Sequence, residues 1–346
     1  MTMPRSKYVK DGEEGVYHCI SRCVRRAFLC GYDAVTGQDY SHRKQWIVDR
    51  LKHLASIFAI DVCAYAVMEN HPHNILRTRP DIIAEWSDQK VATHWLTLCP
   101  RKRPKKNKPA PPLELQIQGL AACPERIAVL RKRLCSVSWF MAKLNEYIAR
   151  AANKEDGVKG RFWEGRFKCQ ALLDDAAIAA CMSYVDLNPI RAGVAETPEG
   201  SDFTSIQERI RCWQKENMAD GCSLDEEVMK PEDGADSWLC PIQSDGHRRG
   251  ILSMSATEYF DLVDQSGRII RTNKRGSIDT HLNPILVRIG AIPEAWSETV
   301  SRFGSRFCLA VGRLDNLRSF AKRIGNQWLK GVKSTRLSFA SSVTKE

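Results

Sequence analysis

The stretch Val67-Met68-Glu69-Asn70-His71-Pro72-His73-Asn74-Ile75-Leu76-Arg77 places two histidines one residue apart, between two apolar runs. Residues i and i+2 of an extended chain point to the same side. His71 and His73 are therefore expected to aim their imidazoles at one point, as two ligands of a divalent metal do. An isolated His-x-His is more often a pair of surface histidines near a turn, so the choice depends on the rest of the chain.

The segments around this stretch alternate between strand and helix patterns. Residues 15–24 alternate apolar and polar side chains, and residues 62–68 form a short apolar run, so both are predicted strands. Residues 42–58 have apolar side chains at helical spacing and predict an amphipathic helix. With residues 71–78 as a further strand, the order is strand, helix, strand, strand.

Helices and a polar loop are predicted after these strands. Residues 80–98 and 124–152 carry apolar stripes at helical spacing, and each stripe predicts one helix that packs in the core. Between them, residues 101–112 contain six cations and four prolines. Such a segment is a solvated loop or a contact to phosphate, and the sequence leaves both interpretations open.

Cations and aromatic residues interleave in residues 160–168, Gly-Arg-Phe-Trp-Glu-Gly-Arg-Phe-Lys. This pattern suits a nucleic-acid groove, in which cations bind phosphate and rings stack on bases. It also suits a strand whose aromatic face lies in the core. The candidate contacts to nucleic acid are Arg161, Arg166 and Lys168, together with Arg22 at the end of the first strand. Residues 169–173 read as the last strand.

The composition favours a polyanionic partner. The chain of 346 residues is 43% hydrophobic, as is ordinary for a globular protein, but its formal net charge is +11. No run of 18 apolar residues and no apolar segment within residues 1–10 is present, so we expect no membrane span, no signal peptide and a cytoplasmic location. The 13 scattered cysteines contain no C-x-x-C pair and are expected to be reduced thiols.

A second constellation lies near the end of the helix predicted for residues 174–188, which Asp174 caps and Pro189 ends. Tyr184 and Asn188 are four residues apart and share a helical face. If that face lies beside His71 and His73, Asn188 offers a third ligand oxygen and Tyr184 a hydroxyl that can attack phosphorus. Taken alone, Tyr184 would be a half-buried core residue.

At this point the sequence resembles a known family. His71-Pro72-His73 after Val-Met-Glu-Asn resembles the HUH motif of single-tyrosine transposases, and Tyr184-Val-Asp-Leu-Asn-Pro-Ile-Arg-Ala-Gly resembles their tyrosine helix. The REP-associated tyrosine transposases and their IS-type relatives are the nearest match. Residues 16–22, 160–168 and 202–205 extend the resemblance, which covers about residues 10–215 with an insertion at about 80–125.

The resemblance implies an α+β, ferredoxin-like antiparallel sheet with helices on one face. It implies a transposase that nicks and transfers single-stranded or hairpin DNA through a covalent 5′-phosphotyrosine. Tyr184 would be the nucleophile, and His71, His73 and Asn188 would bind Mg²⁺ or Mn²⁺. Relatives act as monomers or as dimers with exchanged tyrosine helices, so a homodimer stays open.

One residue departs from the family pattern. Pro72 occupies the middle of the HUH motif, where a large apolar residue is usual. Proline cannot donate to a sheet ladder. Either its missing N–H faces no partner, or the strand is distorted and the site is impaired.

Three other functions remain open from sequence. The chain could be a catalytically impaired DNA-binding protein derived from such a transposase, a hydrolase whose metal site adds Glu69 or Asp186, or an RNA-binding protein. Residues 216–254 are expected to be a linker or irregular cover. Residues 255–346 are expected to form a helical C-terminal extension, with helices at 256–263, 283–289, 293–303 and 311–329, and they match no motif.

Overall fold

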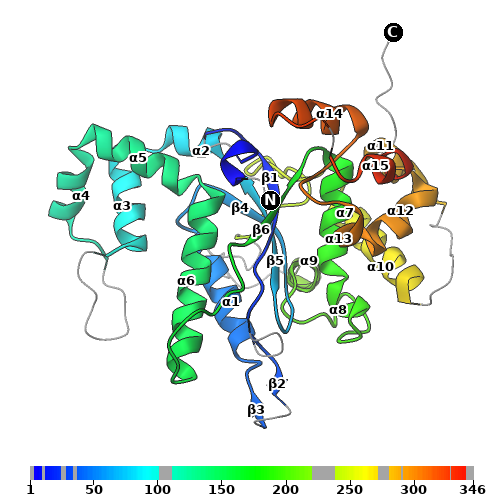
Figure 1. The fold of residues 1–346 in the computed structure, drawn as a ribbon, viewed down its shortest axis with the longest axis horizontal. Coiled ribbons are helices and arrows are strands. Elements are labelled where there is room, and N and C mark those ends of the chain that lie inside the picture. The colour runs from blue at the N-terminus through cyan, green and yellow to red at the C-terminus, as the bar shows by residue number, and fades with distance from the viewer. Residues whose placement is uncertain are drawn as a thin grey trace.

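A five-stranded sheet forms the centre of the molecule (Figure 1). The computed structural model describes residues 4–9, 12–24, 29–33, 37–100, 111–219, 238–271, 280–289, 291–327 and 329–339. In spatial order the strands are β4 (Ile60–Val67), β5 (Pro72–Thr78), β1 (Val16–Ile20), β6 (Lys168–Leu172) and β7 (Ala310–Val311). A separate two-stranded ribbon pairs β2 (Tyr32–Asp33) with β3 (Gln38–Asp39).

The chain order of the first four large strands gives a ferredoxin-like sheet. The order is β1, α1 (Arg43–Ala55), β4, β5, α6 (Val137–Glu155) and β6. The pairs β4–β5, β5–β1 and β1–β6 are antiparallel, which is the split β-α-β arrangement of this fold. The predicted α+β class with an antiparallel, ferredoxin-like sheet is confirmed, and β7 adds a short parallel strand beside β6.

Helices cover both faces of the sheet, so the prediction of helices on one face was wrong. Helices α1 and α6 lie on one side, and α7 (Asp175–Asp186) lies on the other (Figure 1). The reason is that neighbouring strand residues are apolar in both directions: Leu76 belongs to the core under α1 and α6, whereas Ile75 belongs to the core under α7. A sheet that is apolar on both faces needs two covering layers.

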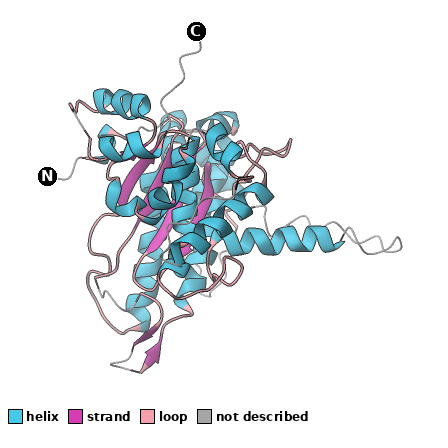
Figure 2. Ribbon diagram, turned by 90° about the vertical axis from the view of Figure 1, so that its right-hand side faces the viewer, coloured by secondary structure: helices cyan, strands magenta, loops and turns pink. Residues whose placement is uncertain are grey.

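The C-terminal region supplies much of the second layer. When the right-hand side of Figure 1 faces the viewer, helices of this region lie in front of the strands (Figure 2). Its elements are α10 (Ala256–Arg271), α11 (Asn283–Ile289), α12 (Pro293–Ser301), α13 (Phe303–Arg306), β7, α14 (Leu314–Arg323) and α15 (Val332–Ser338). Val311 was predicted to begin a helix, but it lies in β7, where Leu173 N–H donates to its carbonyl oxygen at 2.9 Å.

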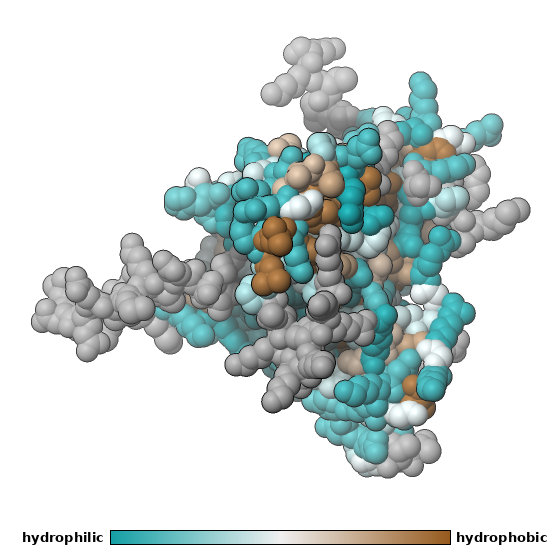
Figure 3. Space-filling model, turned by 90° about the vertical axis from the view of Figure 1, so that its left-hand side faces the viewer, coloured by the Kyte–Doolittle hydropathy of each residue, from teal (hydrophilic) through white to brown (hydrophobic). Residues whose placement is uncertain are grey.

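The described part of residues 80–134, which includes the region predicted as an insertion, forms a helical lobe at one end of the molecule (Figure 1). It contains α2 (Pro80–Glu85), α3 (Asp88–Leu98), α4 (Glu114–Ala121) and α5 (Pro124–Leu134). The side of the molecule that carries this lobe is mostly hydrophilic, with small scattered apolar patches (Figure 3). The basic segment lies largely outside the described residues, which exclude 101–110.

Two predicted helices are each broken in two. The helix predicted for residues 124–152 divides at Ser136, whose backbone is extended with φ −105° and ψ 118°. The helix predicted for residues 80–98 divides at Ser87, whose side chain accepts from Lys90 N–H and starts α3. At Ser87 the capping side chain competes with continuation of the helix before it, and an apolar stripe does not reveal that competition. Ser136 makes no such side-chain cap.

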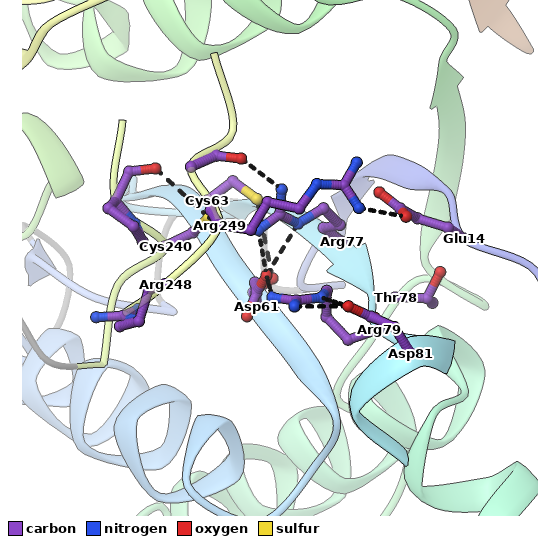
Figure 4. A network of polar contacts seen from close by, with 12 residues as sticks. Glu14, Asp61, Cys63, Arg77, Thr78, Arg79, Asp81, Cys240, Arg248 and Arg249 are labelled. Atoms are coloured by element: carbon purple, nitrogen blue, oxygen red, sulfur yellow. Dashed lines mark hydrogen bonds and ion pairs between the residues drawn. The ribbon is translucent and has the colours of Figure 1, made fainter. Parts of the chain in front are cut away.

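Residues 238–254 form an irregular cover over the open edge of the sheet at β4. Arg77 of β5 is the centre of the contacts that hold it (Figure 4). Its guanidinium donates to Asp61 Oδ2 at 2.6 Å, to the Arg249 carbonyl at 2.6 Å and to the Gly250 carbonyl at 2.7 Å. Residues 220–237, also predicted as linker or cover, lie outside the described residues.

Two further predictions concern the whole chain. All cysteines within the described ranges are free thiols, as expected. None of the helices in those ranges combines the length and the apolar character needed to cross a membrane.

Candidate functional site

The two histidines of the opening stretch lie side by side at the start of β5. His71 is the last residue of the loop that joins β4 to β5, and His73 is the second residue of β5. Their ring centroids are 4.7 Å apart. The i and i+2 geometry therefore brings both imidazoles to one side, as the alternation of an extended chain requires.

Pro72 causes no distortion of this strand. It is the first residue of β5, a position where proline is tolerated, and it pairs in register with Val67. Its carbonyl accepts from Ser21 N–H at 3.4 Å, so β1 still bonds to it. The only irregularity in the β4–β5 pairing lies between Val62 and Ala64 of β4, about three residues from Val67, the partner of Pro72.

A third histidine, which the sequence analysis did not assign, supports the pair. His18 Nε2 lies 2.8 Å from His73 Nδ1, and the two rings are stacked with centroids 5.1 Å apart. A hydrogen bond to Gln170 holds His18 from the other neighbouring strand. The strand pattern could have identified His18, because it shares one face of β1 with Val16 and Ile20.

Burial keeps these imidazoles neutral. Desolvation lowers the pKa of His18 to about 4, although the hydrogen bond from its ring to Gln170 opposes the shift. Desolvation lowers the pKa of His71 to about 4, helped by the positive charges of Arg22 and Lys168. Desolvation also lowers the pKa of His73 well below its ordinary value, with added repulsion from the other two histidines.

Tyr184 completes the cluster from the opposite layer. Its ring centroid lies 5.7 Å from that of His73 and 6.1 Å from that of His18. The guanidinium of Arg191, one turn beyond α7 in α8 (Asn188–Arg191), lies 4.8 Å from the centre of the Tyr184 ring. Helix α7 thus places the tyrosine beside the histidines.

The C-terminal region closes this cluster from the far side. Phe303 stacks on Tyr184 with ring centroids 5.6 Å apart. A Cβ placed on Gly304 would lie only 2.8 Å from the Tyr184 hydroxyl oxygen, so that position has no room for a side chain. The Ser301 carbonyl accepts from Arg191 at 2.5 Å and orients that guanidinium. No sequence motif pointed to this wall, because it depends on packing between segments more than 100 residues apart.

A cation-lined cavity of about 590 Å³ surrounds the cluster. The predicted contacts Arg22, Arg166 and Lys168 line it, and none of the three has an ion pair or side-chain hydrogen bond to another described residue. Arg191 and Arg302 also line it and were not assigned from sequence.

The remaining features of residues 160–168 are structural. Arg161 does not line the cavity, because its guanidinium donates to the Trp163 and Glu164 carbonyl oxygens of its own loop. Phe162 and Phe167 are buried in the core, as the alternative interpretation predicted, but residues 160–167 form a loop and not the strand that it assumed. The rings therefore pack inward while Arg166 and Lys168 face the cavity.

One buried nitrogen atom makes the histidine cluster compatible with a metal: His73 Nε2 has no hydrogen-bond partner among the described residues. Asn188 Nδ2 is also buried without such a partner. His71 Nδ1 contacts the Asn70 side-chain oxygen, so a proton there leaves a lone pair on Nε2.

Asn188, the predicted amide ligand, begins α8, after a turn at Leu187 that separates it from the helix of Tyr184. Rotating its amide by 180° would put Oδ1 where Nδ2 now lies. Asn188 does not line the cavity itself. Within the described ranges, no three His, Cys, Asp or Glu side chains converge on one point, so a metal here depends on the amide and on solvent or substrate oxygens.

Comparisons with known proteins add little to this geometry. No protein-family model matches the chain, and no curated protein matches it. A solved structure of a REP-associated tyrosine transposase bound to a REP hairpin is similar, with 12% sequence identity and a TM-score of 0.35, over 68% of this chain and 97% of that chain. A TM-score this low does not establish a common fold, so function has to be argued from the side chains themselves.

Proposed function

We propose that the protein is a transposase, a single-strand DNA endonuclease and strand transferase that cuts DNA through a covalent 5′-phosphotyrosine at Tyr184. The observation that carries the proposal is the meeting of Tyr184, His71 and His73 in one cation-lined cavity. The resemblance of the sequence to single-tyrosine transposases, in the order of the histidine and tyrosine motifs, supports the same activity.

The chemistry follows from the tyrosine. Tyr184 Oη attacks the scissile phosphorus, the bond from phosphorus to O3′ breaks, and the 5′ phosphate of the downstream fragment becomes joined to Tyr184. The proton that Oη loses equals the proton that the departing O3′ gains. Attack by a second 3′-hydroxyl reverses the step, frees Tyr184 and joins two strands without an external energy source.

The cations of the cavity account for substrate binding. Arg22, Arg166 and Lys168 attract the phosphates on either side of the cut, and they would release counterions when DNA binds. Arg191 lies over the Tyr184 ring, where its fixed charge favours the extra negative charge that develops on phosphorus.

A divalent metal would be held by His71 and His73, with Asn188 as the third ligand. It would polarise the scissile phosphate when bound. Two imidazole nitrogens with one amide oxygen favour Mn²⁺ over Mg²⁺, because Mg²⁺ prefers oxygen ligands. His18 acts one step away, since its contact with His73 Nδ1 fixes the orientation of that ring.

The packing of α7 on the sheet of its own chain supports a site in which one chain supplies the tyrosine for the first cut. A homodimer, if it forms, would serve the joining of two ends.

The test is an adduct assay. Single-stranded and hairpin oligonucleotides from the flanks of the gene are incubated with protein and Mn²⁺, and a covalent protein–DNA band is sought on a denaturing gel. We expect Tyr184→Phe and His71→Ala to abolish it and EDTA to suppress it. Tyr147→Phe is the matched control, because Tyr147 is exposed on α6 across the sheet.

Two outcomes would redirect the assignment. If Tyr184→Phe forms the adduct as well as the parent protein, another residue is the nucleophile. If the parent protein binds hairpin DNA tightly but forms no adduct in any metal, the chain is the catalytically impaired DNA-binding protein.

A further inference from the structure

A second cavity opens beside the first. Its volume is about 1010 Å³, and Arg166 and Lys168 line both cavities. Its walls come from the N-terminal segment around η1 (Arg5–Lys7), from the start of β6, and from residues 308–309, 325–327 and 329–330 of the C-terminal region. Neither Tyr184 nor the histidines line it, so it is a separate site that shares two cations with the candidate active site.

The charge of this cavity is of one sign. Its cations are Arg5, Arg166, Lys168 and Lys330, and no aspartate or glutamate of the described ranges lines it. The Arg5 guanidinium lies 3.7 Å from the centre of the Phe167 ring, and its Nη1 is buried without a hydrogen-bond partner. Burying a hydrogen-bond donor without a partner costs free energy. An anion that binds in the cavity would supply the missing acceptor.

The rest of the lining suits a nucleobase. Tyr8, Phe167 and Leu329 are buried and give the cavity an apolar floor. The side chains of Asn326 and Gln327 stand at its edge with no hydrogen bond to another described residue, and amides can read the edges of bases. Cations for phosphate, an apolar surface for the base and amides for its edge are the three parts that recognise an unpaired nucleotide.

We propose that this cavity, the flank pocket, binds unpaired nucleotides that continue from the scissile phosphate. The inference rests on the proposed function, because it takes the phosphate at Tyr184 as the start of the path. Arg166 and Lys168 hold the backbone where the strand passes from one cavity to the other, and Lys330 holds it at the far end. The C-terminal region thereby contributes to the choice of DNA.

Cys308 provides a direct probe of occupancy. It is exposed and lines the flank pocket. Its alkylation by iodoacetamide is followed by mass spectrometry in Tyr184→Phe with EDTA, so that only binding is observed. We expect a hairpin with an unpaired flank to slow alkylation at least about fivefold and a blunt hairpin to have little effect. Cys99 in the helical lobe, half-buried and remote, is the internal control.

A charge variant tests the same path by affinity. Lys330→Ala should weaken binding of the flanked hairpin about fivefold and leave binding of the blunt hairpin unchanged. Lys333→Ala, which removes an exposed lysine outside the cavity, should change neither. Equal losses for both hairpins, or protection of Cys308 by polyglutamate as strong as by DNA, would contradict the proposal.

The two proposals fail separately. A covalent adduct in the wild type without protection of Cys308 overturns only the flank pocket. Protection of Cys308 by flanked DNA without any adduct leaves the pocket in place and overturns the nucleophilic role of Tyr184.

Discussion

His18 makes the stability of the fold sensitive to acid, because it is buried as a neutral imidazole beside the two candidate ligands. The pKa of His18 is about 4 in the folded protein, against an ordinary value of 6.5. Between these values the unfolded chain binds more protons, so the free energy of unfolding falls as the pH falls from about 6.5 to about 4. For His18 the loss at pH 5 is about 2 kcal/mol.

The prediction is tested by urea unfolding with EDTA at about pH 7.5 and about pH 5. His18→Gln should lose less stability between the two values than the parent protein does. Asp186 works in the opposite direction, since burial raises its pKa to about 6 and its folded form gains protons first. Comparing parent and variant cancels that contribution. An identical pH response in both proteins would show that His18 is not kept neutral by folding.

Gly304 determines whether the Tyr184 hydroxyl can reach its place. A methyl group there would lie 2.8 Å from Oη and 3.3 Å from Cζ, so Gly304→Ala has to displace the ring. A misplacement of about 1 Å can cost about 100-fold in rate. We expect the rate of adduct formation to fall at least tenfold, while hairpin affinity stays within about twofold.

Gly119→Ala is the matched control for that substitution. Gly119 lies in helix α4 of the remote lobe, and a Cβ there meets nothing within 4 Å. It should leave the rate unchanged. Normal adduct formation by Gly304→Ala would mean that the C-terminal wall does not position the tyrosine.

At the scale of elements, Asp186 fixes the helix that carries the tyrosine. Its carboxylate accepts from Ser205 Oγ at 2.6 Å and from Ile206 N–H at 3.2 Å, both at the start of α9 (Ser205–Ala219). Its other oxygen accepts from the Tyr259 hydroxyl of α10 at 2.6 Å. Asp186 is thus a structural anchor, which removes one carboxylate from the hydrolase interpretation.

The pair of Asp61 and Arg77 joins β4, β5 and the irregular cover (Figure 4). Only 3% of the Arg77 side chain is exposed, so Asp61→Asn leaves a buried guanidinium without its counter-charge. We expect a loss of about 3 kcal/mol in the free energy of unfolding. Asp264→Asn, which breaks the exposed pair with Arg268, should cost less than about 0.5 kcal/mol in the same urea titration. Similar costs for both variants would refute a structural role for the buried pair.

Periodicity predicted most elements, because apolar alternation and helical stripes report directly on burial. It failed where a side chain that caps the next helix ended the helix before it, as at Ser87, and where a short strand was paired by distant residues, as at Val311. It also missed the helical layer on the second face. That layer is needed because both faces of β5 are apolar. The neighbours Ile75 and Leu76 lie in different cores, which becomes visible only once the sheet is assembled.

At the scale of the molecule, only some residues of the candidate site could be predicted from the sequence. Local spacing predicted that His71 and His73 share one side of the strand, and the resemblance to single-tyrosine transposases predicted Tyr184 beside them. Arg302 and the wall at Phe303 and Gly304 were not predicted, since their place depends on how α12 and α13 pack against α7.

The five cations of the first cavity predict how DNA binding depends on salt. For single strands the slope of log K against log salt is about −0.7 for each phosphate neutralised. Lys168 lines both cavities, so Lys168→Ala should make the slope less steep by about 0.7 and weaken binding for every sequence alike. Arg150→Ala is the control, because Arg150 pairs with Glu146 on α6 across the sheet and should leave the slope unchanged. Fluorescence anisotropy of a labelled hairpin at several salt concentrations measures both slopes, and an unaltered slope for Lys168→Ala would place the DNA path elsewhere on the molecule.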